Sequence, residues 1–338
     1  MKFGVFLIVL FAVAFALAQP ARVTSTVSPV NSSFRALSVV DNRVAWVAGS
    51  NGHVGRTEDG GNTWTFNQVK DFEELDLRSL YAFDHSRAII ANAGSPAYIL
   101  ATRNGGQTWE VVYANSHANA FLDGVDFWND NEGLIYGDPI DGRMLLLRTI
   151  DGGNSWSVVE QAPLLAQGEA SFAASGTGIR CVKPNQVVIT TGGTMSRVWR
   201  SADKGSTWTS ISVPVIQGES STGVFSIGML QNNWVVVGGD YLQPSKADRH
   251  IFYSADGGAT WHVPATGTRG YRECVEPAGN GMWLAAGPTG VEFSADDGKT
   301  WRPLSDETGF HTVRKARTGS LILLAGSRKL GYVRIKTN

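Results

Sequence analysis

Six short repeats carry the most conspicuous chemical groups of the chain. They share the form [Ser/Thr]-x-Asp-x-Gly-x-[Thr/Ser]-Trp, in which asparagine replaces aspartate only in the second copy. The acidic position holds Asp59, Asn104, Asp151, Asp203, Asp256 and Asp296, and the closing position holds Trp64, Trp109, Trp156, Trp208, Trp261 and Trp301. Carboxylates in such a setting could act as acids, as nucleophiles or as calcium ligands.

The spacing of these repeats favours a structural role over a catalytic one. Consecutive copies lie 40 to 53 residues apart, so the carboxylates belong to separate units and cannot converge on one substrate. An Asp side chain accepts backbone N–H bonds in a tight turn, and the Gly permits a positive φ there. We therefore predict that each repeat, called a box below, is a turn whose Trp packs between neighbouring units.

A second group of polar residues lies between the boxes, at the starts of predicted inner strands or in the loops that connect units. For acid/base hydrolysis of a glycan, which needs two carboxyl groups roughly 5 to 10 Å apart, the candidates are Glu169, Asp123 and Asp138. For binding a partner, the candidates are Arg78, His117, Arg143, Arg180, Tyr241, Arg269, Tyr271, Arg272 and His311. The alternative for all of them is that arginines and carboxylates pair with one another around a solvated channel.

The elements that must position these residues are short strands. Residues 37–40, 44–49, 53–57 and 64–69 alternate with Gly, Asn and Asp turns, which is typical of an antiparallel meander. The same plan returns seven times, although the last unit, from about Phe310, has three strands and no box.

Residues 23–30 alternate in hydropathy and can supply the missing strand. Pairing them with the end of the chain closes a ring without exposed edges. We predict an all-β, seven-bladed β-propeller of four-stranded blades, closed by the N-terminal strand. In this fold the box turns lie on one face, and the candidate site residues are expected on the opposite face.

Residues 1–18 read as a secretory signal peptide, because Lys2 precedes an apolar run that ends in Ala16-Leu17-Ala18. No cysteine lies near this cleavage site, which argues against lipid attachment there. The mature chain, residues 19–338, is expected to be one exported propeller domain, periplasmic or extracellular, with no membrane span after cleavage. Cys181 and Cys274 fall on innermost strands of different blades and in the same register, so we predict two free, buried thiols.

Composition excludes several function classes. The formal net charge is -1, which provides no field for nucleic acid or an anionic membrane. Histidines do not occur at ligand spacing with cysteine or a second histidine, and no phosphate-binding loop is present. We expect no metal, no cofactor, no nucleic-acid partner and a monomeric protein.

The repeats resemble the Asp-box, or bacterial neuraminidase repeat (BNR), of sialidases, other glycoside hydrolases and sortilin-type receptors. The order of boxes in short blades is most similar to the photosystem II stability and assembly factor family, whose relatives occur widely as exported bacterial proteins. The sialidase motif Phe/Tyr-Arg-Ile-Pro is not matched, because Phe34-Arg35-Ala36-Leu37 lacks the Ile-Pro. This departure argues against sialidase activity.

Two functions follow from these observations. The first is a non-catalytic exported propeller that binds a protein or glycan partner through the face opposite the boxes, as the assembly-factor resemblance implies. The second is a carbohydrate-active enzyme, a glycoside hydrolase or lyase, that uses the carboxylates and arginines of that same face.

Overall fold

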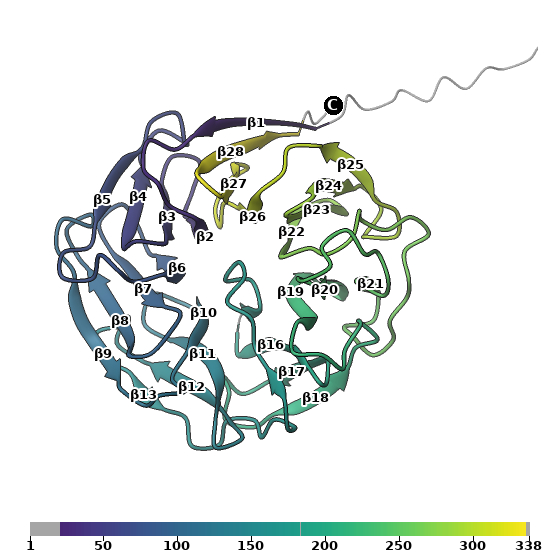
Figure 1. Cartoon of the computed structure of the whole chain (residues 1–338), viewed down its shortest axis with the longest axis horizontal. Helices are drawn as coiled ribbons and strands as arrows, with labels where there is room; N and C mark the ends of the chain where they lie inside the picture. The colour runs from purple at the N-terminus through teal and green to yellow at the C-terminus, as the bar shows by residue number, and fades with distance from the viewer. Residues whose placement is uncertain (1–20, 183, 336–338) are drawn as a thin grey trace, which may run out of the picture.

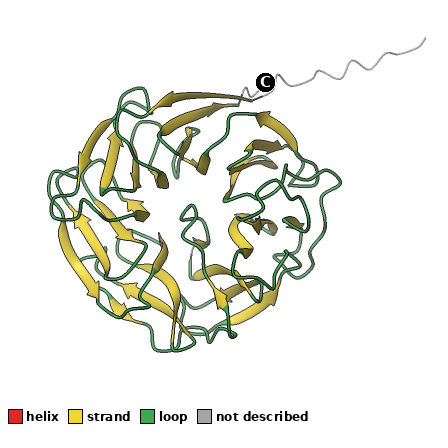
Figure 2. Ribbon diagram, in the orientation of Figure 1, coloured by secondary structure: helices red, strands yellow, loops and turns green. Residues whose placement is uncertain are grey.

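The computed structural model describes residues 21–182 and 184–335. Within these residues the chain forms strands, turns and loops but no helix, and the sheets stand around a ring (Figures 1 and 2). No helix long and apolar enough to cross a membrane is therefore found in this part of the chain. The predicted signal peptide, residues 1–18, lies outside the described residues.

The first fourteen strands are β1 (Arg22–Val27), β2 (Phe34–Val39), β3 (Ala45–Gly49), β4 (His53–Thr57), β5 (Thr65–Gln68), β6 (Leu77–Ala82), β7 (Ala88–Asn92), β8 (Ala97–Thr102), β9 (Glu110–Asn115), β10 (Leu122–Phe127), β11 (Gly133–Ile140), β12 (Arg143–Thr149), β13 (Ser157–Val158) and β14 (Glu169–Ala170). The remaining strands are β15 (Ile179–Val182), β16 (Gln186–Gly193), β17 (Arg197–Ser201), β18 (Thr209–Ser212), β19 (Thr222–Leu230), β20 (Asn233–Asp240), β21 (Ile251–Ser254), β22 (Cys274–Gly279), β23 (Met282–Gly287), β24 (Gly290–Ser294), β25 (Arg302–Ser305), β26 (Phe310–Lys315), β27 (Ile322–Gly326) and β28 (Lys329–Arg334).

These strands form antiparallel meanders of the predicted kind. Five sheets have four strands, and a larger sheet of eight strands joins β14–β18 to β19–β21. The link between its two halves is the pair Gly192 and Gly223. The predicted closure of the ring is present, because β1 pairs antiparallel with β28 from Arg22 opposite Arg334 to Val27 opposite Lys329. The two ends of the described chain therefore lie side by side in one sheet (Figure 1).

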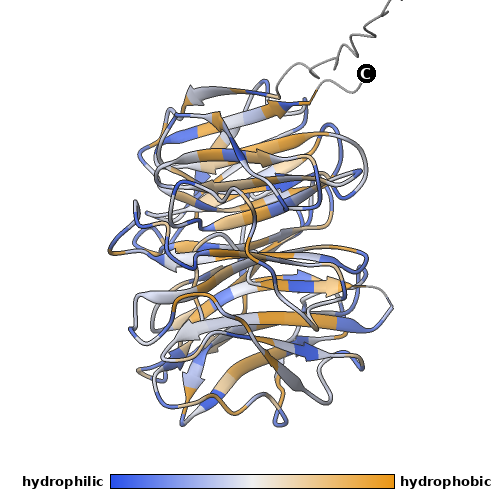
Figure 3. Ribbon diagram, turned by 90° about the vertical axis from the view of Figure 1, so that its right-hand side faces the viewer, coloured by the Kyte–Doolittle hydropathy of each residue, from blue (hydrophilic) through white to orange (hydrophobic). Residues whose placement is uncertain are grey.

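Apolar side chains of neighbouring sheets pack against one another to form the core, and the strands carry most of the hydrophobic colour in Figure 3. Six of the hydrophobic clusters between sheets include one box tryptophan each, as predicted: Trp64, Trp109, Trp156, Trp208, Trp261 and Trp301. The cluster between the β22–β25 sheet and the β26–β28 sheet has no tryptophan among its described members, since the last unit has no box.

The first box shows how the turn is fastened. The Thr57 hydroxyl donates to Asp59 at 2.8 Å and accepts the backbone N–H of Gly61 at 3.0 Å. Asp59 also accepts the backbone N–H and the hydroxyl of Thr63, at 2.9 and 2.6 Å. The Trp64 indole N–H donates to the carbonyl of Gly61 at 3.2 Å. Both carboxylate oxygens are thus used within the turn.

The asparagine box keeps the same geometry with one hydrogen bond reversed. Asn104 Oδ1 accepts the Thr102 hydroxyl and the backbone N–H of Thr108, each at 3.0 Å. Its amide then donates to the Thr108 hydroxyl at 2.8 Å, where a carboxylate would accept. In the first box the hydrogen bond from the Thr63 side chain is the main reason that the pKa of Asp59 falls to about 2.

Both cysteines are free and lie on innermost strands, as predicted. Their expected common register is wrong. Cys274 begins β22 opposite Ala286 and is buried, whereas Cys181 lies opposite Val187 towards the other end of β15. Cys181 is only half-buried, because that end of the strand lines a cavity. The prediction of a buried thiol therefore holds for Cys274 and not for Cys181.

Candidate functional site

Most inner strands begin with the same irregularity. The pairing register shifts at or near the start of the strand, and an extra residue is left without a partner on the neighbouring strand. The residues at this position are Arg35, Arg78, Asp123, Phe225 and His311. They lie at the end of the channel opposite the boxes, which we call the box-free mouth.

A loop lies across this mouth. Residues 171–176, here called the plug, leave β14 and reach towards the centre of the ring (Figure 1). Arg35 of β2 donates to the carbonyl of Ala174 at 3.2 Å. The Ser175 hydroxyl donates to the carbonyl of Glu273, beside β22, at 2.7 Å. Because these hydrogen bonds tie the loop to inner strands on other sides of the ring, it packs as a plug.

The plug forms one wall of a cavity of about 560 Å³ at the box-free mouth. Of the predicted binding residues it brings together Arg78, Tyr241, Tyr271 and His311. Its acidic centre is Glu273, which is buried and accepts from Arg35 at 2.7 Å and pairs with His311 Nδ1 at 2.8 Å. The charges at this mouth are therefore largely paired with one another.

One side of the cavity is aromatic. The rings of Phe172 and Phe225 stack with centroids 3.7 Å apart, and Tyr271 meets Phe225 edge-on at 4.7 Å. Tyr241 also meets Phe225 edge-on at 6.3 Å and remains 47 % exposed. Phe225 and Tyr271 are buried, so a partner can reach the rings of Tyr241 and Phe172. Exposed tyrosine and arginine side chains are enriched at protein interfaces.

Two of the three candidate catalytic carboxyls lie near this mouth. Asp123 is fully buried, and neither of its oxygens has a hydrogen-bond partner in the described part of the chain. Burial, with the nearby carboxyl of Asp138, raises the pKa of Asp123 well above its usual range. Asp138 is half-buried, lines the cavity and accepts the backbone N–H of Ser171 at 2.9 Å. Burial also raises the pKa of Asp138.

The third candidate, Glu169, is committed to a structural network. It is 1 % exposed and forms an ion pair with Arg197 of β17. It also accepts the Thr191 hydroxyl at 2.6 Å and the Trp199 indole N–H at 3.2 Å. Although burial alone would raise it, these hydrogen bonds hold the pKa of Glu169 below its usual value. A carboxylate held in this way is poorly suited to donate a proton.

Two further predicted binding residues lie outside the cavity. His117 is exposed in the loop before β10, where its ring accepts the backbone N–H of Asn119 at 3.2 Å. Arg143 begins β12 and donates to the carbonyl of Ala162 at 2.6 Å. Neither lines the cavity at the box-free mouth.

Three of the predicted arginines are committed elsewhere. Arg272 is fully buried and forms an ion pair with Glu292, which Arg269 also contacts at 2.8 Å. The expected placement of Arg180 on the box-free face is wrong. Arg180 is the second residue of β15, but this strand starts late and Arg180 lies opposite Val188, near the start of β16. It pairs with Glu276 at 2.8 Å, in a cavity on the box face.

Sequence reasoning did not single out Arg35, Phe172 or Phe225 as site residues. A signal for Arg35 was available, because it follows the first apolar residue of its inner strand as Arg78 and His311 do. Phe172 and Phe225 carry no such signal, since their stacking depends on the path of the plug. Within residues 21–182 and 184–335, no group of three or more His, Cys, Asp or Glu side chains is placed to hold a metal ion.

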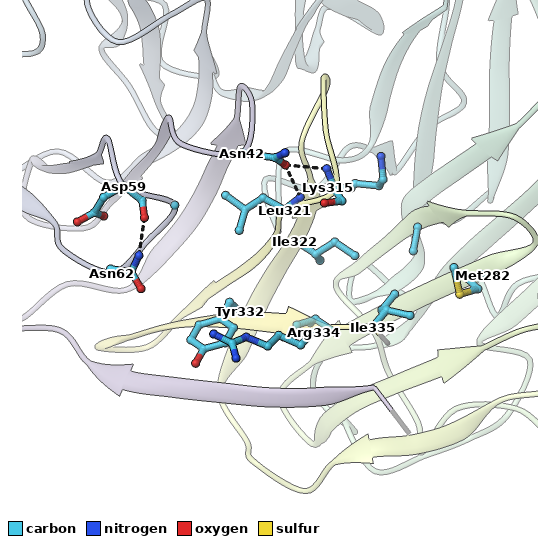
Figure 4. Close-up of a pocket in the computed structure, with 14 residues that line it drawn as sticks. Asn42, Asp59, Asn62, Met282, Lys315, Leu321, Ile322, Tyr332, Arg334 and Ile335 are labelled. Atoms are coloured by element: carbon cyan, nitrogen blue, oxygen red, sulfur yellow. Dashed lines mark hydrogen bonds between the residues drawn. The ribbon is translucent and has the colours of Figure 1, made fainter. Parts of the chain in front are cut away.

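A separate cavity of about 560 Å³ lies on the box face, where a box of the last unit would stand (Figure 4). Its apolar wall includes Met282, Ile322, Val333 and Ile335. Asn42 bounds it and accepts the backbone N–H of Leu321 at 3.0 Å. These apolar residues belong to or adjoin the cluster that has no tryptophan among its described members.

The family is decided by a match over most of the chain. A family model described as photosynthesis system II assembly factor YCF48 matches residues 21–118 and 93–246, and a BNR/Asp-box repeat model matches residues 252–263. The chain belongs to the YCF48 family. The predicted resemblance to the assembly-factor family and to Asp-box proteins is therefore confirmed.

Relatives of this YCF48-family chain agree in sequence and in fold. "Photosystem II assembly lipoprotein Ycf48" of Synechococcus sp. (strain CC9902) is 23 % identical over 282 residues, covering 80 % of this chain and 75 % of that protein. A solved structure described as "YCF48 bound to D1 peptide" aligns with a TM-score of 0.67 and 17 % identity, over 93 % of this chain and 97 % of the other.

YCF48 from Cyanidioschyzon merolae aligns with a TM-score of 0.68 and 16 % identity, over 92 % of this chain and 98 % of the other. The GH74 xyloglucanase from Xanthomonas campestris aligns with a TM-score of 0.62 and 14 % identity, over 91 % of this chain and 53 % of the other. At these identities the structural matches show the fold alone, which is a β-propeller.

Proposed function

We propose that this YCF48-family chain is a non-catalytic assembly or stability factor that binds a protein partner at its box-free mouth. The binding surface is the cavity that brings Arg78, Tyr241, Tyr271 and His311 together beside Phe172. The exposed ring of Tyr241 and the half-buried ring of Phe172 supply contact area, and arginine N–H groups bind carboxylates or backbone carbonyls of a peptide. The solved relative bound to D1 peptide supports a peptide-like segment as the partner. A glycan is the alternative ligand for the same aromatic surface.

The observation that carries this proposal is the pairing of charges around the plug. Glu273 is held by Arg35 and His311, and Glu169 is held by Arg197. Glu273 and Glu169 therefore stabilise the fold rather than stand free towards a substrate. A rigid mouth of this kind favours binding, because little conformational entropy is lost when a partner docks.

The rival function, glycoside hydrolysis, has less support. It requires two accessible carboxyl groups on opposite sides of a bound glycan. Of the three candidates, Asp123 is sealed from solvent and Glu169 is held in its ion pair, so Asp138 alone lines the cavity at the mouth. The fold similarity to a xyloglucanase does not change this, since one fold hosts many activities.

We also propose that the mature chain, residues 19–338, is a single exported domain of seven blades that acts as a monomer in the cell envelope. The count of seven treats the eight-stranded sheet as two meanders, which are linked through the pair Gly192 and Gly223. Export is supported by the signal-peptide pattern and by the lipoprotein relative. Ala18-Gln19 at the expected cleavage site offers no cysteine for a lipid.

The test is a binding screen with matched variants on the two faces. The purified mature chain is panned against a displayed peptide library, and selected peptides are then measured with Arg78→Ala and Tyr241→Ala. We expect each substitution to weaken binding at least about tenfold, whereas Arg302→Ala, an exposed position on β25, leaves it unchanged.

A parallel screen of sialosides and polysaccharides addresses the rival function. Turnover of a glycan that is lost in Asp138→Asn, together with peptide binding that is indifferent to Arg78 and Tyr241, would refute the proposal.

A further inference from the structure

The opposite end of the channel has a different character. On the box face, a cavity of about 620 Å³ is lined by Arg180, Arg314, Lys315 and Arg317, with Asp126 and Glu276 among them. We call this cavity the box-face mouth. Strand β26 connects the two mouths, since it carries His311 near its start and Arg314 near its end. No part of the proposed partner-binding surface lies here.

Three acids line the box-face mouth: Asp126, Glu276 and the exposed Asp130, which pairs with Arg87 at 3.5 Å. One oxygen of Glu276 pairs with Arg180 at 2.8 Å, and the other accepts the backbone N–H of Lys315 at 3.1 Å. Asp126 accepts the backbone N–H of Cys181 at 2.7 Å and its neighbour's N–H at 2.9 Å. Each carboxylate oxygen of Asp126 and Glu276 therefore has a donor that belongs to the fold.

Arg180 and Arg317 are likewise satisfied. Arg180 donates to the carbonyl of Ile227 at 2.7 Å in addition to its pair with Glu276. Arg317 donates to the Ser38 hydroxyl at 3.1 Å and lies 4.4 Å above the ring of Tyr81. Both guanidinium groups are fixed by the protein itself.

Arg314 differs from these neighbours. It is half-buried on the cavity wall, and its side chain has no ion pair or hydrogen bond to any residue in the part of the chain that the structure describes. Burial and the like charge of Arg180 lower the pKa of Arg314. A guanidinium has five N–H donors in a planar fork. Among the described residues, none of the nitrogens of Arg314 is a buried atom without a partner, so these donors are open to the cavity and to a ligand.

We propose that the box-face mouth is a binding site for an oxyanion, a carboxylate or phosphate group, held by the guanidinium fork of Arg314. Such a group matches the fork with two parallel N–H bonds, and the charge of Arg180 adds attraction. The cavity has ample room for an ion of this size. The site lies at the opposite end of the channel from the proposed partner surface, so each can fail without the other.

The test measures anion binding by the purified mature chain. Isothermal titration is performed with inorganic phosphate and, separately, with acetate, in a buffer free of other oxyanions. We expect saturable binding of at least one of them at one site. Removing both charge-assisted bonds with Arg314→Gln should weaken that binding roughly a hundredfold, whereas Arg302→Gln, exposed on β25, should leave it unchanged.

Arg314→Lys keeps the charge but not the fork, so we expect intermediate affinity, and it also serves if Arg314→Gln fails to fold. Tighter binding of phosphate assigns a phosphoryl ligand, and tighter binding of acetate assigns a carboxylate. The proposal is overturned if neither anion binds the wild-type chain, or if a folded Arg314 variant binds the anion as tightly as the wild type.

Discussion

The two mouths of the channel use the same residue types in opposite ways. At the box-free mouth, Arg35 and His311 share Glu273, and the plug is tied to the surrounding inner strands. At the box-face mouth, the acids are satisfied by Arg180 and by backbone N–H groups, and Arg314 is left over. At the box-free mouth the charge of Glu273 is balanced by Arg35 and His311, whereas at the box-face mouth Arg314 has no acidic partner among the described residues.

This difference follows from where an inserted segment goes. The connection before β15 is long enough to send residues 171–176 into the channel, where backbone carbonyls and the Ser175 hydroxyl meet polar side chains from several strands. No segment of the described chain enters the channel in this way from the box face, where short hairpin turns and six boxes connect the strands. Polar groups there must be satisfied by one another or by a ligand.

The largest effect is expected when the internal pairing of the box-free mouth is broken. Glu273→Ala leaves Arg35 and His311 without their shared acid in a buried setting. We expect the free energy of unfolding to fall by about 3 kcal/mol, at the low end for a buried pair because Arg35 is partly exposed and keeps the Ala174 carbonyl.

Urea denaturation measures this loss. Glu58→Ala, which removes a surface pair with Arg56, is the matched control and should cost less than about 1 kcal/mol. Equal effects of the two substitutions would contradict the view that the box-free mouth is held together by its charges.

The next effect tests the plug itself. Phe172→Ala removes the ring that stacks on Phe225, and we expect a loss of about 2 kcal/mol because Phe172 is only half-buried. Cys274 lies beneath the plug, where its sulfur contacts the Thr177 hydroxyl at 3.5 Å. Loosening the plug should therefore speed alkylation of Cys274.

Cys181 provides the internal control for this measurement, since it lines the box-face mouth and does not depend on the plug. Mass spectrometry after a pulse of iodoacetamide reports both thiols in one sample. An alkylation rate of Cys274 that does not change in Phe172→Ala would show that residues 171–176 do not guard the channel.

A smaller effect is expected for Asp123, the buried acid near the box-free mouth, where a substitution should raise the free energy of unfolding rather than lower it. Because folding raises the pKa of Asp123, its contribution to stability is complete below the unfolded pKa of about 3.9 and is lost as the pH rises above it. Asp123→Asn removes the ionisable group, so the variant should be more stable than the wild type at pH 7. The advantage should vanish near pH 3, as thermal unfolding across that range will show. A variant that is less stable at pH 7 would mean that the carboxylate has a partner of its own.

The sequence predicted the repeating strands and the closure of the ring, but not where each inner strand begins. The boxes fixed the turns, the tryptophan positions and the closure by β1, because each depends on local chemistry or on counting units. Arg180 and Cys181 were misplaced because the connection between units is longer before β15, which hides where that strand begins. Pairs such as Glu169 with Arg197 depend on the tertiary path and have no local signal.

The smallest expected effect concerns Asp59 of the first box, whose pKa is shifted in the opposite direction from that of Asp123. Asp59 has a pKa of about 2 in the folded chain, mainly because the Thr63 side chain donates to it. Its stabilising contribution is therefore present above the unfolded pKa of about 3.9 and is lost as the pH falls through the folded pKa of about 2. Asp59→Asn should destabilise the chain slightly at pH 7 and hardly at all at about pH 1, because Asn104 shows that an amide keeps the turn. Asn104→Asp is the reciprocal variant and should gain the same acid-sensitive contribution. If the two substitutions shift the acid-unfolding midpoint in the same direction, hydrogen bonds to the box carboxylate are not what couples this face to pH.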